Sequence, residues 1–518
     1  MLLGIIGIIL SLVLLITLAY RGMPVIIAAP IASVVALVFS GAPILASYTE
    51  IFMPAMAGYV GSYFPIFLLG AIFGLLMTVT GYAESIARTV TGWIGARNAI
   101  LATVITSALM TYGGISLFVV AFVMFPLARE LFRVADIPKR LIPGTIALGI
   151  FTFTMTALPG TPQVQNLIPG QFFGTGAYAA PILGIIAAVM IFGGGWAWLE
   201  YRRRSLQAKG EHFEGLGATT ADGRSGIHAA ARAASHSASH SASRPASRPG
   251  TGRGPGAALR EQERAEDRPA VEAEDNAHGV QAMLAPRHPL LPFIPLLTVF
   301  AVTFACTLLI FPNLEWGYLA EEKFGGVDMD RRSGIWAVIL GLLVAILVIV
   351  AFNIREFAAL RKGFAEGVKG SMLPIFSVGS EVGYGAVVAS VAAFAFIRDS
   401  VFNIGGGALV TSVVSTSVTA AITGSSSGGM TIALNAFGEE LRNLAVEQGV
   451  SLEIMHKMTA LAAGGLDTLP HSGAVVTLLI VCGMTHRQSY KDIGMVTLVV
   501  PALTVAILLG ALFLLGLA

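Results

Sequence analysis

The sequence predicts an all-α polytopic membrane protein, from its composition, the length of its apolar runs and an internal repeat. The 518 residues are 55% hydrophobic and only 12% charged, whereas an ordinary soluble protein carries about 25% charged residues. Apolar runs of roughly 18 residues or more recur along the whole chain, and a helix of that length crosses a bilayer. Related motifs recur in the same order in the two halves. The net charge of +2 gives no reason to expect a nucleic-acid partner.

We predict about ten full spans and two interrupted apolar stretches. The full spans are expected at about 3–20, 24–41, 59–81, 141–168, 177–199, 288–312, 334–353, 372–397, 454–483 and 493–517. The interrupted stretches, at about 98–128 and 403–437, contain small polar residues near their centres. Cys306 and Cys482 lie in apolar runs, which is typical of small core residues, so we expect neither a disulfide nor a metal site.

A segment of different composition, residues 203–285, divides the chain. It is rich in Ser, Ala, Arg, His, Gly and Pro, a composition that cannot bury enough apolar surface to fold. We therefore predict a disordered insert between two membrane repeats, residues 1–202 and 286–518. The basic run that opens at Arg202 places this insert in the cytoplasm.

Three matches relate the two repeats. The Pro-Ile-Phe motif at Pro65 recurs at Pro374, and Leu158-Pro159 recurs as Leu469-Pro470. The glycine-containing interruption at Thr111–Gly114 has a counterpart at 424–429. Internal repeats in membrane proteins are typical of transporters whose site lies at the repeat interface.

The distribution of Lys and Arg predicts that the repeats are inverted. The expected loop 42–58 has neither residue, whereas the matching loop 354–370 has four, and basic loops favour the cytoplasmic side. Both flanks of 98–128 are basic, which indicates a re-entrant hairpin with its tip at Thr111–Gly114. The acidic segment 438–453 suits an external hairpin with its tip near Ser425–Gly429. The alternative is two ordinary spans in place of each hairpin.

Candidate binding residues follow from four places where the helical backbone is interrupted, the two tips and the two proline breaks. Irregular backbone at membrane depth is tolerated only where protein or a cavity surrounds it. Free N–H groups at a half-helix end hold an anion, and we find no Lys or Arg in the centre of a span. The candidates are Thr111, Tyr112, Gly113, Gly114, Thr161, Gln163, Asn166, Ser425, Ser426, Ser427, His471 and Ser472. The alternative is that small residues only allow close helix packing.

Two acidic residues within the expected spans are candidates for proton coupling. Glu381 lies between glycines in 379–383, and Asp467 precedes Pro470 by three residues. Charged side chains inside spans are rare, costly and usually functional. The alternative for each is an internal polar contact between helices. His456 is expected at the membrane interface.

The stretches Thr111-Tyr-Gly-Gly-Ile-Ser116, Phe118–Phe125 and Ala157-Leu-Pro-Gly-Thr-Pro-Gln-Val-Gln-Asn166 resemble the GntP-type gluconate:proton symporter permeases of the ion-transporter superfamily. The resemblance implies an inverted repeat with two hairpins and two broken helices. It also implies a scaffold domain that forms a homodimer, a transport domain that moves like an elevator, and a bacterial inner membrane. Sodium carriers of the superfamily have Ser-Asn-Thr tips. Here the tips are Tyr-Gly-Gly and Ser-Ser-Ser-Gly-Gly, which favours protons as the coupling ion.

The expected function is proton symport of a small hydroxylated carboxylate such as gluconate. A sodium-coupled di- or tricarboxylate carrier is one alternative, and a channel or sensor acting through the insert is another. We expect no enzyme, cofactor or metal, because no phosphate-loop lysine motif, zinc-spaced cluster or nucleophile elbow is recognisable. The expected partners are a small organic anion, the coupling proton, membrane lipid and a second copy of the chain.

Overall fold

The computed structural model is all-helical apart from one short hairpin, as the sequence predicts. It describes residues 2–21, 23–95, 98–213, 215–216, 288–324, 326–403, 405–470 and 472–518. Six helices within these residues are long and apolar enough to cross a membrane, and they lie at Ile44–Val79, Pro181–Gln207, Phe293–Asn313, Met329–Phe352, Phe357–Ser390 and His486–Leu514.

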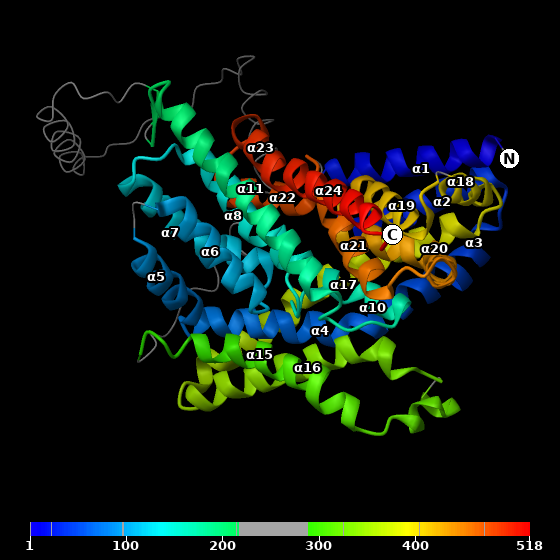
Figure 1. Cartoon of the computed structure of the whole chain (residues 1–518), viewed down its shortest axis with the longest axis horizontal. Coiled ribbons are helices and arrows are strands. Elements are labelled where there is room, and N and C mark those ends of the chain that lie inside the picture. The colour runs from blue at the N-terminus through cyan, green and yellow to red at the C-terminus, as the bar shows by residue number, and fades with distance from the viewer. Residues whose placement is uncertain are drawn as a thin grey trace, which may run out of the picture.

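The first half runs from α1 to a β-hairpin (Figure 1). Its elements are α1 (Leu2–Tyr20), α2 (Val25–Ser40), α3 (Ile44–Ser47), the π-helical turn η1 (Tyr48–Phe52), α4 (Met53–Val79), α5 (Tyr82–Ile94), α6 (Ala99–Tyr112), α7 (Leu117–Val134), η3 (Lys139–Leu141), α8 (Ile142–Ile150), α9 (Phe153–Thr156), η4 (Val164–Asn166), α10 (Ile168–Phe173), α11 (Pro181–Gln207), β1 (Glu211–His212) and β2 (Gly215–Leu216). The two strands pair antiparallel.

The second half is helical throughout its described residues. Its elements are α15 (Phe293–Ala305), η5 (Cys306–Ile310), η6 (Phe311–Asn313), η7 (Gly317–Ala320), η8 (Glu322–Phe324), α16 (Met329–Phe352), α17 (Phe357–Ser390), α18 (Ala393–Phe402), α19 (Gly407–Thr423), α20 (Ser426–Gln448), α21 (Leu452–Leu466), α22 (Gly473–Val481), α23 (His486–Gly494), η9 (Met495–Val499) and α24 (Val500–Leu514).

The same order of packed helix pairs occurs in both halves. Helix α1 packs on α2, and α15 packs on α16. Helix α6 packs on α7 and α8, and α19 packs correspondingly on α20 and α21. Each half therefore has a helical hairpin followed by a third helix, α8 or α21, that packs on it and precedes the proline break.

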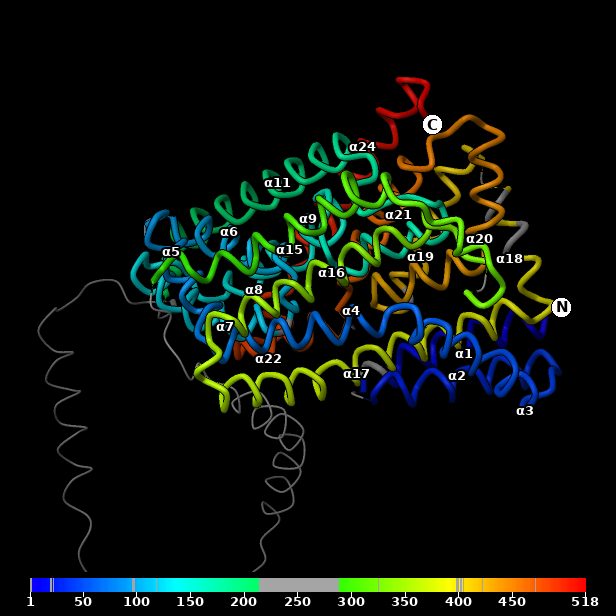
Figure 2. Tube along the Cα trace, turned by 90° about the horizontal axis from the view of Figure 1, so that it is seen from below, coloured from blue at the N-terminus to red at the C-terminus, as the bar shows by residue number. Residues whose placement is uncertain are grey.

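The two Pro-Ile-Phe helices, α4 and α17, pack along one another and run antiparallel (Figures 1 and 2). Gly367 of α17 lies against Ile72 of α4, and Gly383 lies against Phe52 just before α4. Residue numbers thus rise along one helix as they fall along the other. Opposite directions for related helices are what an inverted repeat requires.

The expected loops 42–58 and 354–370 are largely helical, which corrects the sequence interpretation. Residues 44–79 form one continuous helical run, and α17 begins at Phe357. Lys, Arg and Glu are good helix formers, so α17 extends into the charged segment before its apolar part, whereas residues 44–58 are largely apolar and continue the helix without a break. On α17, Lys369 Nζ donates to Glu366 Oε1 at 2.9 Å across one turn. The span expected at 372–397 also ends sooner, at Ser390.

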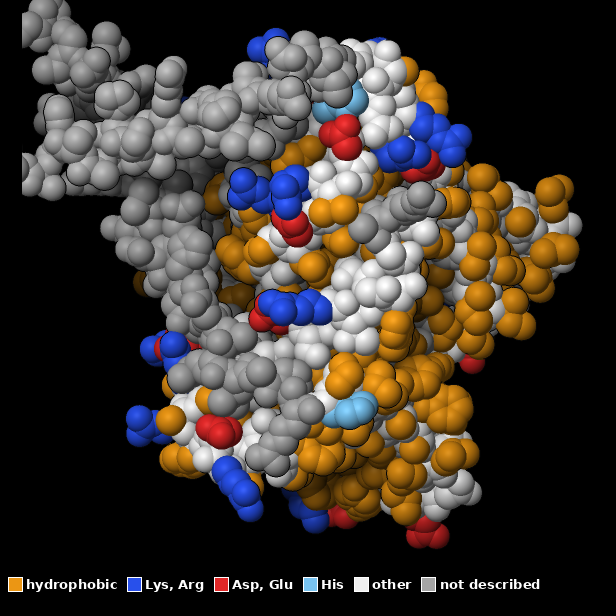
Figure 3. All heavy atoms as spheres, turned by 90° about the vertical axis from the view of Figure 1, so that its left-hand side faces the viewer, with side chains coloured by type: hydrophobic (Ala, Val, Ile, Leu, Met, Phe, Trp, Pro, Cys, Tyr) orange, Lys and Arg blue, Asp and Glu red, His pale blue; other side chains and the backbone are white. Residues whose placement is uncertain are grey.

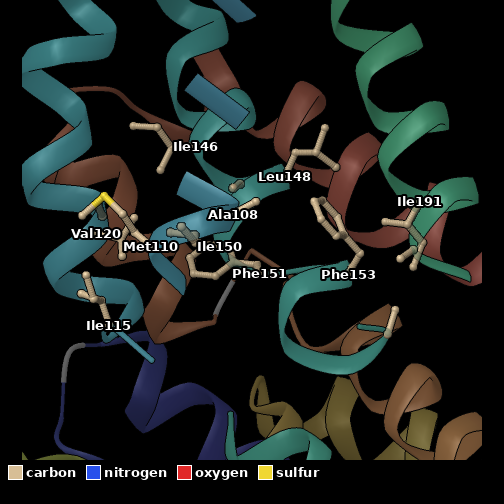
Figure 4. Close-up of a cluster of buried hydrophobic side chains, with 14 of the residues drawn as sticks. Ala108, Met110, Ile115, Val120, Ile146, Leu148, Ile150, Phe151, Phe153 and Ile191 are labelled. Carbon is tan, nitrogen blue, oxygen red and sulfur yellow. The ribbon is translucent and has the colours of Figure 1, made fainter. Parts of the chain in front are cut away.

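A buried apolar cluster joins α6, α7, α8 and α11 (Figure 4). Met110 of α6, Val120 of α7, Ile146 of α8 and Ile191 of α11 belong to it. Gly149 permits the close approach of α8 and α6, because a Cβ at this position would lie 2.8 Å from the Val104 carbonyl oxygen. The packing holds the first hairpin rigidly against the helix that precedes the first break.

A buried ion pair ties the end of the first half to the second. Arg202 Nε on α11 donates to Asp492 Oδ1 on α23 at 2.7 Å, and the Trp198 indole N–H donates to the same oxygen at 3.1 Å. The Arg202 side chain is 9% exposed and that of Asp492 is fully buried. Figure 3 views this end of the molecule, where charged side chains are spread over the face and hydrophobic side chains dominate to its right.

The segment predicted as an insert begins within structured chain. Helix α11 continues to Gln207, and the hairpin packs beside η3, with Arg140 Nη1 3.5 Å from Glu211 Oε2. His212 Nδ1 lies 2.5 Å from Asp136 Oδ2. Residues 217–287 lie outside the described residues, so the prediction of disorder there stays a prediction.

Candidate functional site

The second hairpin has a tip of two residues. Helix α19 ends at Thr423 and α20 begins at Ser426, so Gly424 and Ser425 alone connect them. Gly424 has a φ of +63°, which a residue with a side chain rarely adopts. Ser425 caps α20, and its hydroxyl accepts the Gly428 N–H at 3.2 Å. The tip is therefore tighter than the predicted Ser425–Gly429, because Ser426 to Gly429 already form the first turn of α20.

Glu381 of α17 reaches the first turn of α20. It is 5% exposed, and its carboxyl lies against the Ser425 side chain. A Cβ added to Gly428 would overlap Glu381 Oε2. This oxygen has no hydrogen-bond partner among the described residues. A carboxyl buried at a helix N-terminus is in the place that the helix dipole favours for an anion.

Asp467 reaches the same turn from another element. It caps the C-terminal end of α21, is 9% exposed, and its carboxyl lies against both the hydroxyl and the backbone N–H of Ser426. Oδ1 of Asp467 has no hydrogen-bond partner within the described part of the chain. The structure thus brings together, at consecutive serines, the two carboxyls that the sequence singled out separately.

Side chains from both breaks also contact the second tip. The Ser472 hydroxyl donates to the Gly424 carbonyl oxygen at 2.9 Å. From η4 in the first half, Gln165 Nε2 donates to Ser426 Oγ at 3.1 Å. Ser427 is buried one residue further along α20. His471, a predicted site residue, lies outside the described residues.

Tyr59 of α4 completes the surroundings of Glu381. Its hydroxyl is buried without a partner among the described residues, and its electrostatic neighbours are Tyr63 and Glu381. The two tyrosine rings lie 4.7 Å apart. No pattern in the sequence points to Tyr59, because an aromatic residue in an apolar helix is usually part of the core.

The first tip is packed with apolar side chains. Gly113 lies against Leu296 of α15. Gly114 has a φ of +93°, and a Cβ added to it would lie 3.3 Å from the Leu342 side chain of α16. Thr111 is fully buried, and its hydroxyl has no partner in the described structure. The Tyr112 hydroxyl donates to the Pro159 carbonyl oxygen at 2.7 Å. This tip thus contacts the first break directly.

Polar groups of the first break bond within the protein. The Thr161 hydroxyl donates to the Thr154 carbonyl oxygen at 2.7 Å. Gln163 Nε2 donates to the Thr111 carbonyl oxygen at 2.8 Å. Asn166 Nδ2 donates to the Ala177 carbonyl oxygen at 2.8 Å. In this state, the break uses these side chains to satisfy its own irregular backbone.

Lys457 on α21 corrects the expectation that this region has no buried basic group. It is 0% exposed, and Nζ donates to Asn166 Oδ1 at 2.9 Å. No carboxylate lies within 4 Å of it in the described part of the chain. Its position close to the start of an expected span hid it. The sequence feature that could have indicated a buried Lys457 is the run of nine uncharged residues, 458–466, that follows it.

His456 is also buried, although an interfacial position was expected. Its Nε2 lies 3.0 Å from the Asn166 carbonyl oxygen, and its Nδ1 lies 2.7 Å from the Thr175 hydroxyl. Helix α21 therefore bonds the first break through two successive side chains. The first break is thus hydrogen-bonded by α21, the helix that precedes the second break.

Comparison with known proteins agrees with this architecture. A model described as "GntP family permease" matches residues 1–223. The protein named "Uncharacterized transporter YxjC" from Bacillus subtilis (strain 168) is 39% identical over 507 residues, which cover 97% of this chain and 97% of that protein. The similarity therefore extends over both halves of the chain.

Proposed function

The chain belongs to the GntP permease family, and from this premise we propose that it is a proton symporter for a small hydroxylated carboxylate such as gluconate. Family membership and the apolar helices make it a multi-pass membrane transporter. The substrate, the coupling ion and a bacterial inner-membrane location belong to the proposal.

One observation carries the proposal: two buried carboxyls, Glu381 and Asp467, meet the first turn of α20 beside three consecutive serines. Carboxyl oxygens without partners are suited to take up and release a proton. Serine hydroxyls and the N–H groups of a helix N-terminus are suited to a hydroxylated anion. Buried ionisable groups in a membrane protein typically mark such pathways.

The arrangement of the halves supports the inverted-repeat part of the proposal. Helices α4 and α17 are antiparallel, and α6 has 14 residues, which is about 21 Å of helix. Because a bilayer core is about 30 Å thick, α6 is short for a crossing, which favours a re-entrant hairpin. Division into scaffold and transport domains and homodimerisation follow from the family resemblance.

Lys457 favours a second candidate, a sodium-coupled carrier of di- or tricarboxylates. A substrate with more charge needs more cationic groups, and this buried ammonium is one. The carboxyls and serines at the second tip are also hard oxygen ligands of the kind that bind small cations. We place this candidate second because the tips lack the Ser-Asn-Thr sequences of sodium carriers.

Counterflow in proteoliposomes tests the proposal. Purified protein is reconstituted in four sets of vesicles, each loaded with unlabelled gluconate, 3-hydroxybutyrate, citrate or succinate, and uptake of the same compound in labelled form is followed with and without sodium at constant pH. We expect exchange of gluconate without sodium and accumulation when the outside is acidified. Exchange of citrate or succinate alone, with a sodium requirement, would establish the second candidate. No exchange of any carboxylate would refute both.

A further inference from the structure

We propose that Glu381 is a tethered competitor of the substrate. Its carboxylate occupies the first turn of α20 in the empty carrier and leaves when it takes up a proton, so that the substrate carboxylate can take its place. This inference rests on the proposed function and adds how proton and substrate binding are tied together.

The geometry at α20 carries the inference. Of the N–H groups in the first turn, that of Gly428 binds Ser425, and that of Ser426 faces Asp467. The Glu381 carboxyl fills the remaining space against Gly428 and Ser425. No Lys or Arg lies within 4 Å of it among the described residues. The helix end is therefore the favourable environment for this charge, and it is the same environment that a substrate carboxylate would require.

The two anions exclude one another. The site is buried, so charges interact there through a low dielectric, and a substrate carboxylate beside an ionised Glu381 is repelled strongly, more so because the Asp467 carboxyl faces the same turn. A neutral Glu381 exerts no such repulsion and has less reason to remain at the positive end of the helix. Protonation therefore releases the turn for the substrate.

Among the described residues on the α17 side of the α20 turn, Glu381 is the carboxyl that can change its charge. From α4 it faces the Tyr59 phenol, and from the other side of the α20 turn comes Asp467. Helix α2 carries no ionisable side chain, and Glu50 of η1 is exposed. The side chains of 397–399 on α18 lie outside the described set.

Gly428 offers an independent way to test the competition. A Cβ here would overlap Oε2 of Glu381, the far end of a flexible side chain, which can move. The substitution Gly428→Ala should therefore push the carboxylate out of the turn without changing its charge. Gly370 on α17 meets nothing within 4 Å when given a Cβ, so Gly370→Ala is its matched control.

The proton balance of the cycle follows. On the outer side, one proton from the medium binds Glu381, the neutral side chain leaves the turn, and one substrate carboxylate binds there. After the carrier has reoriented, the substrate leaves, Glu381 loses its proton to the cytoplasm, and the carboxylate returns to the turn. One proton thus enters with each substrate by way of Glu381, and a proton carried by Asp467 would be a second one.

The test measures gluconate affinity against pH for the full chain in detergent, by calorimetry, with exchange in proteoliposomes alongside. Wild type should bind more weakly as pH rises, by up to about tenfold per pH unit once Glu381 ionises, because the competent fraction falls. Glu381→Gln should lose most of this dependence and bind more tightly at high pH. Gly428→Ala should reduce it. Glu366→Gln, an exposed change on α17, and Gly370→Ala should follow wild type.

The outcomes separate the two proposals. If wild type binds gluconate but Glu381→Gln keeps the wild-type pH profile, the competition is refuted and the proposed function stands. Loss of binding in folded Glu381→Gln at every pH would refute it as well, by showing that the carboxylate helps to bind. Should Glu381→Gln fail to fold, an unaltered profile in Gly428→Ala refutes it. If wild type binds no carboxylate at any pH, the proposed function itself fails.

Discussion

The two proline breaks of this chain differ in how their polar groups are used. In the first, Gln163 and Asn166 donate to backbone carbonyl oxygens, and Lys457 donates to Asn166. At the second tip, which contacts the second break, Glu381 and Asp467 each keep a buried carboxyl oxygen without a partner among the described residues. Two segments that the sequence treats as equivalent thus have different surroundings.

This difference suggests a division of work between the repeats. The first break has bonds enough to hold its shape, including those from α21 of the other half. The second tip retains polar groups that can accept a proton or bind a ligand. The Thr111 hydroxyl at the first tip also has no partner in the described structure, but the groups at the second tip are ionisable, and buried ionisable groups in membrane proteins are usually functional. Each prediction below tests this comparison.

The largest effect is expected from Asn166→Ala. It removes the acceptor of a fully buried ammonium and two donors to backbone. Removing one partner of a buried charge is strongly destabilising, here by roughly 3 kcal/mol. Thermal unfolding in detergent should show a much lower midpoint. Asn98→Ala, at the exposed N-cap position of α6, is the control. An unchanged midpoint for Asn166→Ala would show that the first break is not structural.

Asp467→Asn should lower the substrate accumulation that a pH gradient drives by tenfold or more, because an amide cannot carry a proton. Uptake of labelled substrate into acid-outside proteoliposomes measures it. Asp330→Asn, at an exposed position in the first turn of α16, should accumulate substrate like wild type. Normal accumulation in Asp467→Asn would contradict a coupling role for this residue.

Two nearby glutamines compare the breaks directly. Gln165→Ala removes the bond to Ser426 Oγ at the second tip and should raise the apparent KM about fivefold, the equivalent of a hydrogen bond of about 1 kcal/mol. Gln163→Ala removes a bond to the Thr111 carbonyl oxygen and should instead lower the free energy of unfolding by about 1 kcal/mol. The reverse pattern would place the binding site at the first break.

The smallest effect is expected from deleting residues 217–283, joined by a short flexible linker. The cut spares the hairpin, where Phe213 is buried. Transport rates and KM should stay within about twofold of wild type, because the proposed function uses no residue of 217–283. Loss of transport after this deletion would favour the sensor hypothesis, in which the insert is essential.

Sequence patterns were enough to predict the helical fold, the two interrupted stretches that form helix pairs, and Glu381 and Asp467 as candidate functional residues. Composition and charge within a span are local properties, so they can be read directly. The sequence could not show that these carboxyls meet, since they lie on α17 and after α21, some 86 residues apart. It also missed Lys457 and Tyr59, whose roles depend on what faces them. The start of α17 at 357 was missed because hydropathy marks apolar length, whereas this helix begins in polar sequence. The start at 44 was missed because residues 44–58, although largely apolar, were assigned to a loop.

The ion pair between Arg202 and Asp492 has a consequence for biogenesis. With the bond from Lys457 to Asn166, it joins the two halves by buried contacts that do not involve residues 217–283. The peptide link between the halves then mainly ensures that they are synthesised together in equal numbers. We expect that two separate open reading frames, one ending after β2 and one starting before α15, would produce fragments that assemble into an active carrier in the same membrane.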